Sequence, residues 1–134
     1  MSTDIAPAEG RVYVKDLSFD HELWDNEMKF YRNELEIFEH RLEQDVVRLT
    51  DKEALRQLEH FQNQFIRQNE VLDILNKRVR KNRKNVARAS VNGGIAIDHM
   101  VVKNYVGLRD EFETFEKIYY DLKRKFVDLN HKYF

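Results

Sequence analysis

The sequence predicts an all-α protein built from three long antiparallel helices. Charged residues make up 35% of the chain and hydrophobic residues 42%, a mixture typical of amphipathic helices. The only proline is Pro7, and the four glycines lie before residue 11 or after residue 92, so nothing breaks a helix between residues 19 and 92. Apolar residues also recur at alternating steps of three and four, the spacing of a buried helix face.

The first helix is expected near residues 20–49. Asp20 is the predicted N-cap, because Phe19 before it and Trp24 after it are spaced to form a hydrophobic staple. Asp45 is the one polar interruption of the heptad seam along this helix. The seam consists of Trp24, Met28, Tyr31, Leu35, Phe38, Leu42 and Leu49.

The second helix is expected near residues 51–90. Thr50 and Glu53 have the spacing of a capping box, in which each residue's side chain bonds the other's backbone N–H. Gly93 and Gly94 suit the turn that ends the helix. The seam consists of Leu58, Phe61, Phe65, Leu72, Leu75 and Val79, with Gln68 as a polar insertion. The very short turn between the first two helices forces them to pack antiparallel.

The third helix is expected near residues 96–133, with irregular first turns. Its seam contains no polar residue and consists of Val101, Tyr105, Leu108, Phe112, Phe115, Tyr119, Leu122, Phe126, Leu129 and Tyr133. The seams predict one domain, an up-down-up bundle over residues 19–134 with coiled-coil-like seams and with Phe38, Phe65 and Phe115 in the common core. Residues 1–18 are predicted to be a flexible or extended segment.

We find no catalytic constellation in the sequence. The chain has no cysteine, which excludes thiolate nucleophiles and disulfides. No histidine is spaced to activate Ser2, Ser18 or Ser90, and the glycine pair at 93–94 lacks the lysine and further glycines of a phosphate-binding loop. We therefore expect no enzymatic activity and no cofactor.

The histidines do not predict a buried metal site. In the heptad registers, His40, His60, His99 and His131 face outward, and only His21 lies on the seam side, at a helix end with no clear partner. A surface zinc site is an alternative, because Glu36 and Glu43 flank His40 and His60 can face it across the hairpin. Solvated surface charge is favoured, so no metal is expected.

A basic run near the end of the second helix is the first candidate binding feature. From residue 77 to residue 90 it has no acidic residue and contains Lys77, Arg78, Arg80, Lys81, Arg83, Lys84 and Arg88. Antiparallel packing brings residues 12–23 and 98–109 opposite it, and their few acidic residues are too few to neutralise the run. It is expected to stay strongly positive, as a solvated cap or as a site for a polyanion.

Apolar residues outside the seams are the second candidate binding feature. Two sets lie well away from the core centre, one on the first helix (Leu23, Phe30 and Ile37) and one on the third (Val106, Tyr120 and Val127). A second stripe with heptad spacing is what helix-on-helix association requires. We therefore expect a homo-oligomer, with a dimer favoured.

These features predict a non-enzymatic helical-bundle interaction or structural module that self-associates. The alternative is a protein that binds nucleic acid or another polyanion through the basic run, or whose basic run docks onto the acidic first helix of another copy. No apolar stretch approaches the roughly 20 residues of a membrane span, so no membrane partner is expected. The cytoplasm is the expected compartment.

Overall fold

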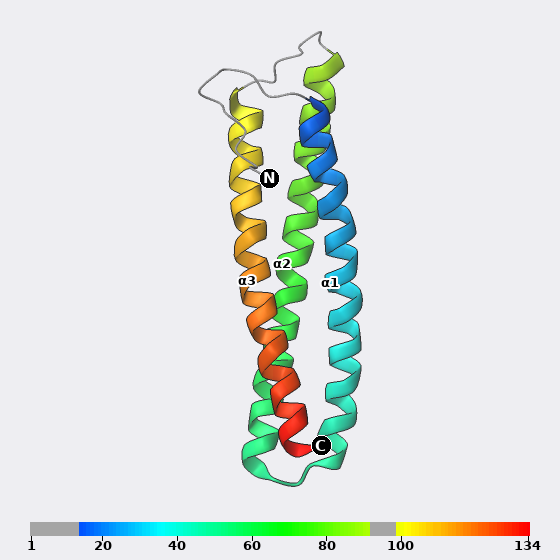
Figure 1. The fold of residues 1–134 in the computed structure, drawn as a ribbon, viewed down its shortest axis with the longest axis vertical. Helices are drawn as coiled ribbons and strands as arrows, with labels where there is room; N and C mark the ends of the chain where they lie inside the picture. The colour runs from blue at the N-terminus through cyan, green and yellow to red at the C-terminus, as the bar shows by residue number, and fades with distance from the viewer. Residues whose placement is uncertain (1–13, 92–98) are drawn as a thin grey trace. The chain divides into compact units, whose positions relative to one another are not determined.

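The computed structural model describes residues 14–91 and 99–134, with side chains for 16–88 and 99–134. Its three helices are α1 (Val14–Arg48), α2 (Lys52–Val91) and α3 (His99–Tyr133), and the described residues form no strand (Figure 1). The predicted all-α class is confirmed. The predicted starts of the second and third helices differ from these bounds by one and three residues, and Gly93 and Gly94 lie outside the described residues.

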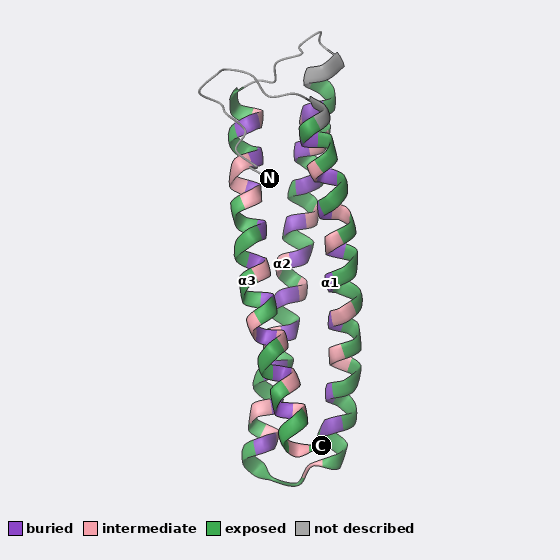
Figure 2. Ribbon diagram, in the orientation of Figure 1, coloured by how far each residue is buried: buried purple, intermediate pink, exposed green. Residues whose placement is uncertain are grey.

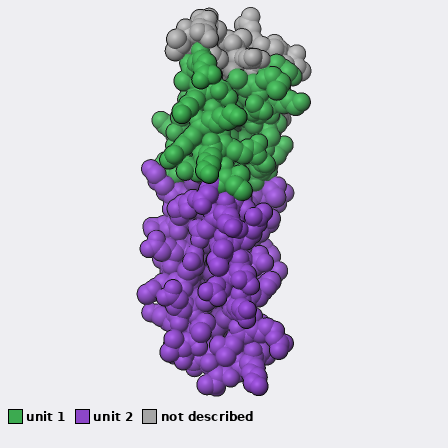
Figure 3. All heavy atoms as spheres, turned by 180° about the vertical axis from the view of Figure 1, so that it is seen from behind, with its two compact units in different colours: residues 1–27, 74–112 green, residues 28–73, 113–134 purple. Residues whose placement is uncertain are grey.

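The chain divides into two compact units, and segments of all three helices contribute to each (Figure 3). Unit 1 comprises residues 1–27 and 74–112, and unit 2 comprises residues 28–73 and 113–134. The helix-breaking residues thus do not mark the division, which cuts across every helix.

Contacts inside each unit give the helix directions. Residue numbers rise together on α1 and α3, which are therefore parallel, and run oppositely on α2, which is antiparallel to both. In unit 2 the pairs are Tyr31–Tyr119, Phe38–Phe126, Arg32–Asp73 and Glu39–Asn69; in unit 1 they are Asp20–Tyr105, Trp24–Phe112, Asn82–Val101 and Arg78–Glu111. The up-down-up arrangement predicted from the seams is therefore present in both units.

The predicted seams form the buried side of each helix (Figure 2). Phe65 and Phe115 are fully buried in unit 2, as expected, whereas Phe38 is half-buried and lies against Phe65 and Phe126. The seam's polar interruptions, Asp45 and Gln68, are buried as well. Heptad spacing therefore located the core, because it depends only on the pitch of the helix.

The predicted start of the first helix was wrong. The helix begins at Val14 and includes Asp20, whose carboxylate accepts a hydrogen bond from the Tyr105 hydroxyl instead of capping the backbone. Phe19 is exposed and forms no staple. Residues 14–18, expected to be flexible or extended, are helical, and residues 1–13 lie outside the described residues. A carboxylate in a helix interior can serve a tertiary contact, which local spacing does not reveal.

The second helix is capped by Asp51 and not by Thr50. Asp51 Oδ1 accepts hydrogen bonds from the backbone N–H groups of Glu53 at 2.8 Å and of Ala54 at 3.3 Å. These bonds satisfy two of the donors that every helix N-terminus leaves free. The prediction of a capping box at Thr50 was one residue early, because aspartate serves equally well as an N-cap.

No helix in the described ranges combines the length and the apolar character that crossing a membrane requires.

Candidate interaction surface

The predicted stripe on α1 is exposed. The exposed fractions are 41% for Leu23 in unit 1, and 51% for Phe30 and 62% for Ile37 in unit 2. These large apolar side chains lie on every second turn of the helix. They stay in contact with water, at a cost in free energy, unless another surface covers them. The exposure agrees with the prediction that these residues lie outside the core of the bundle.

In unit 2 the exposed apolar residues belong to a continuous uncharged surface, which we call the outer face of α1. At 3.6 residues per turn, it lies on the side of the helix opposite Leu35 and Leu42, which are buried. All its residues are exposed, and none carries a formal charge with histidine neutral. It consists of Phe30, Asn33, Ile37, His40, Gln44 and Val47.

The stripe predicted on α3 is less free than the stripe on α1. Tyr120 is 49% exposed, but its ring lies edge-on to Tyr31 and Tyr119, and its hydroxyl lies 3.4 Å from the Tyr31 hydroxyl. Val106 and Val127 are half-buried. Sequence spacing alone did not show that Tyr120 contacts α1 within the same chain.

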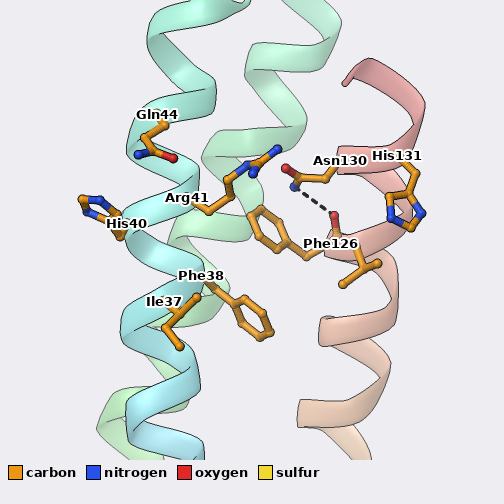
Figure 4. Close-up of a pocket in the computed structure, with 9 residues that line it drawn as sticks. Ile37, Phe38, His40, Arg41, Gln44, Phe126, Asn130 and His131 are labelled. Carbon is orange, nitrogen blue, oxygen red and sulfur yellow. Dashed lines mark hydrogen bonds between the residues drawn. The ribbon is translucent and has the colours of Figure 1, made fainter.

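A groove in unit 2 lies between α1 and α3 beside the outer face. It has a volume of about 440 Å³, and its apolar lining includes Ile37 and Phe38 from α1 and Phe126 and Val127 from α3. Figure 4 shows Phe38 directed toward α3 and His40 directed away from it. The structure thus brings Ile37 and Val127, from the two predicted stripes, to one groove.

Arg41 and Asn130 are two of the five polar residues that line this groove, with His40, Gln44 and His131. Arg41 donates a hydrogen bond from Nε to Asp45 at 3.1 Å, and its guanidinium lies over the Phe134 ring. Asn130 donates to the Phe126 carbonyl oxygen at 3.1 Å (Figure 4), and its own side-chain oxygen is buried with no hydrogen-bond partner within the described residues. The Arg41 guanidinium and the Asn130 amide are therefore held by contacts within the chain.

Two arginines of the basic run have acidic partners, so the prediction that the bundle leaves the run unneutralised was wrong for them. Arg78 forms an ion pair with Glu111 on α3, and Arg83 forms one with Asp25 on α1. Arg83 also donates to the His21 carbonyl oxygen at 3.2 Å. Asp25 and Glu111 lie two residues beyond the segments that helix length placed opposite the run, which explains the error.

The other five cations of the run are exposed in unit 1. No ion pair joins them to another residue of the described ranges; they are Lys77, Arg80, Lys81, Lys84 and Arg88. A polar cleft of about 160 Å³ lies between α2 and α3, lined by Arg78, Lys81, Asn82, Asn85, Asn104 and Leu108. The lining of this cleft thus combines cationic side chains with side-chain amides, and both can donate hydrogen bonds.

His21 has partners that the sequence did not indicate. It is buried in unit 1, its Nε2 lies 2.8 Å from Asn82 Oδ1, and its ring is 5.9 Å from the Trp24 ring. Asn82 in turn donates to the Val101 carbonyl oxygen at 3.3 Å, so the three helices of unit 1 share one polar network. Burial away from water lowers the pKa of His21 below 6.5.

Asn82 escaped notice because it is polar, lies inside the basic run and comes after Val79, the last residue of the predicted seam, although it continues the seam's spacing. Buried asparagine side chains need partners for both the oxygen and the amide, and His21 and Val101 supply them here. A polar residue one helical turn from Val79 was the available signal, since Val79 is part of the predicted seam.

The remaining histidines, His40, His60, His99 and His131, are all exposed. Among the described residues, no three histidine, aspartate or glutamate side chains gather closely enough to hold a metal ion. Comparison of the chain with models of protein families, with curated proteins and with solved structures gives no match. The function must therefore be argued from these surfaces.

Proposed function

We propose that the protein is a non-enzymatic helical interaction module that self-associates as a dimer through the outer face of α1 in unit 2. The observation that carries the proposal is the lack of charge on that face. Charged residues make up 35% of the chain, yet six exposed positions on consecutive turns of one helix carry none. A solvated helix surface is normally charged or strongly polar.

The composition of the outer face supports protein contact. Phe30 and Ile37 supply large apolar side chains, and aromatic residues are enriched in protein interfaces. Asn33 and Gln44 add uncharged hydrogen-bonding groups, which cost less to remove from water than charged ones. An exposed stripe with these properties is suited to packing against another helix.

The proposal is tested by Phe30→Glu, because a carboxylate without a partner is costly to bury at an interface. Size-exclusion chromatography with light scattering should show a wild-type dimer at micromolar concentration and a monomeric variant with unchanged helicity. Ile118→Glu is the matched control, because Ile118 is 49% exposed on α3 and should leave the dimer intact. A monomeric wild type contradicts the proposal.

A second candidate function, binding of a polyanion, is supported by the five exposed cations of unit 1. If they bind nucleic acid, the contacts go to the phosphate backbone, and affinity falls steeply as salt rises because bound counterions are released. Arg80, Lys81 and Lys84 are the residues to change to glutamine together. Arg83 is left intact because its ion pair with Asp25 belongs to the fold.

A mobility-shift titration with generic DNA and RNA at low salt tests this second function. Binding by the wild type and loss of binding in the triple variant supports it. No binding by the wild type, or equal binding by both proteins, contradicts it. Replacing Lys52, Arg67 and Lys117 of unit 2 with glutamine removes the same number of charges from exposed positions and provides the control.

A further inference from the structure

The outer face of α1 consists of two sets of positions with different chemistry. The first set repeats every seven residues as Phe30, Ile37 and Gln44, and its first two members are apolar. The second set repeats every seven residues as Asn33, His40 and Val47, and its first two members are polar. The two sets alternate along the helix at steps of three and four, as the two core positions of a coiled coil do.

This alternation discriminates between two ways of pairing α1 with a second α1. In a parallel pair in register, each set faces its own copy, so Ile37 meets the partner's Ile37 and Asn33 meets the partner's Asn33. In an antiparallel pair centred on this face, each set faces the other, and the layer of Ile37 with the partner's His40 places an apolar side chain against a polar one. Like-with-like layers bury apolar groups together and let the amides hydrogen-bond each other.

The charges beside the outer face are also self-complementary in the parallel arrangement. One edge has Lys29, Glu36 and Glu43, and the other has Glu34, Arg41 and Arg48. In parallel helices in register, each residue of the first edge lies near the partner's residue five positions later. Every such pair in unit 2 is then oppositely charged.

The residues of these pairs differ in the contacts that they already make within their own chain. Glu34 already accepts hydrogen bonds from Tyr119 and Lys123, and Arg41 holds Asp45, so these two are partly committed within the chain. Glu43 and Arg48 are exposed, and no ion pair joins either to another described residue, although the Arg48 guanidinium lies over the Phe134 ring. The pair of Glu43 with the partner's Arg48 is therefore the most available one.

We propose that α1 of one copy packs against α1 of a second copy in parallel and in register, through the outer face in unit 2. This inference rests on the proposed self-association and names its partner and geometry. The polar layers at Asn33 and His40 set the register, because shifting one helix by a turn would place polar side chains against Phe30 and Ile37.

Cysteine cross-linking tests the geometry, since the chain contains no cysteine of its own. Asn33→Cys and Gln44→Cys are made separately and oxidised mildly. In the parallel arrangement both variants should form disulfide-linked dimers on a non-reducing gel, because each position faces its own copy within disulfide range. Glu59→Cys, exposed on α2, is the matched control and should not cross-link efficiently.

An antiparallel dimer gives a different result. Residues 33 and 44 are separated by about 16 Å along a helix, so only one of them can lie near the twofold axis and meet its own copy. Cross-linking at one position or at neither, with a wild-type dimer that Phe30→Glu dissociates, overturns the parallel geometry and leaves the proposed function standing. A monomeric wild type rejects both.

A charge exchange tests the pairing of Glu43 with Arg48. Glu43→Arg places two positive groups at each contact and should raise the dissociation constant several-fold, and adding Arg48→Glu should restore most of the wild-type affinity. Failure of the double variant to recover any affinity contradicts the proposed contact. Helicity measured by circular dichroism verifies that the variants remain folded.

Discussion

In unit 1, a buried histidine on α1 is hydrogen-bonded to a buried asparagine on α2, and aromatic rings join α1 only to α3, whereas in unit 2 aromatic rings join all three helices in the core. Phe65 on α2 lies 5.8 Å from Phe38 on α1 and 5.0 Å from Phe126 on α3, measured between ring centroids. The buried polar residues of unit 2 link helices less: Asp45 is held by Arg41 of its own helix.

The two kinds of contact contribute differently to the free energy of folding and to the alignment of the helices. Aromatic burial supplies a large, weakly directional free energy, so it stabilises a helix pair in many relative positions. The hydrogen bonds of His21 and Asn82 add less net free energy, but they are satisfied in only one alignment of the helices. The His21–Asn82 pair therefore specifies how α1 aligns with α2 in the core of unit 1, whereas the core of unit 2 depends mainly on ring packing. Partly buried hydrogen bonds, such as that from Tyr31 to Glu116, also join helices in unit 2.

The largest effect is expected from Phe65→Ala in unit 2. Phe65 has no exposed surface, and removing its ring should lower the free energy of unfolding by about 3 to 5 kcal/mol through lost burial and a remaining cavity. Urea denaturation followed by circular dichroism measures the loss. The control is Ile66→Ala at the exposed neighbouring position. A loss no greater than that of the control would end the distinction between the units.

A smaller effect is expected from Asn82→Leu in unit 1. The change leaves His21 and the Val101 carbonyl without their partner, which should cost about 1 to 3 kcal/mol of unfolding free energy. Adding His21→Leu should recover part of the loss, because both buried polar side chains are then gone. If the double variant is as unstable as the two single losses added together, the two residues do not act as a unit.

The polar core of unit 1 should also make the stability of the protein depend on pH. The pKa of His21 is lowered in the folded state by burial, so below pH 6.5 the unfolded chain binds more protons and the folded state loses stability. Above that pH the free energy that the buried, neutral His21 contributes to folding is fully present. The urea midpoint of the wild type should therefore fall on acidification by more than that of His21→Leu.

The smallest effect is expected at the turn between α1 and α2 in unit 2. Asp51→Ala removes the acceptor for two backbone N–H groups and should cost about 1 kcal/mol of unfolding free energy. Thr50→Ala should cost less, because Asp51 is the capping residue. A larger loss for Thr50→Ala in urea denaturation would show that the capping box predicted from the sequence is used in solution.

Much of the candidate surface could be predicted from the sequence. The positions of Phe30 and Ile37 relative to the buried seam follow from helical pitch, and they are exposed as expected. Tyr120 and Val127 were harder to interpret, because their use depends on how closely α1 approaches α3. The acidic partners of Arg78 and Arg83 were also missed, because each lies two residues beyond the segment that helix length placed opposite the basic run.

The helices, their seams and the exposure of Phe30 and Ile37 depend on residues a few positions apart, so the sequence was enough to predict them. The pairing of polar groups between helices could be read only from the packed structure. Asp20 with Tyr105, Tyr31 with Glu116 and Glu34 with Tyr119 all pair residues 85 positions apart. Heptad seams repeat every seven residues and are compatible with several such offsets, so the choice among them required the packed side chains themselves.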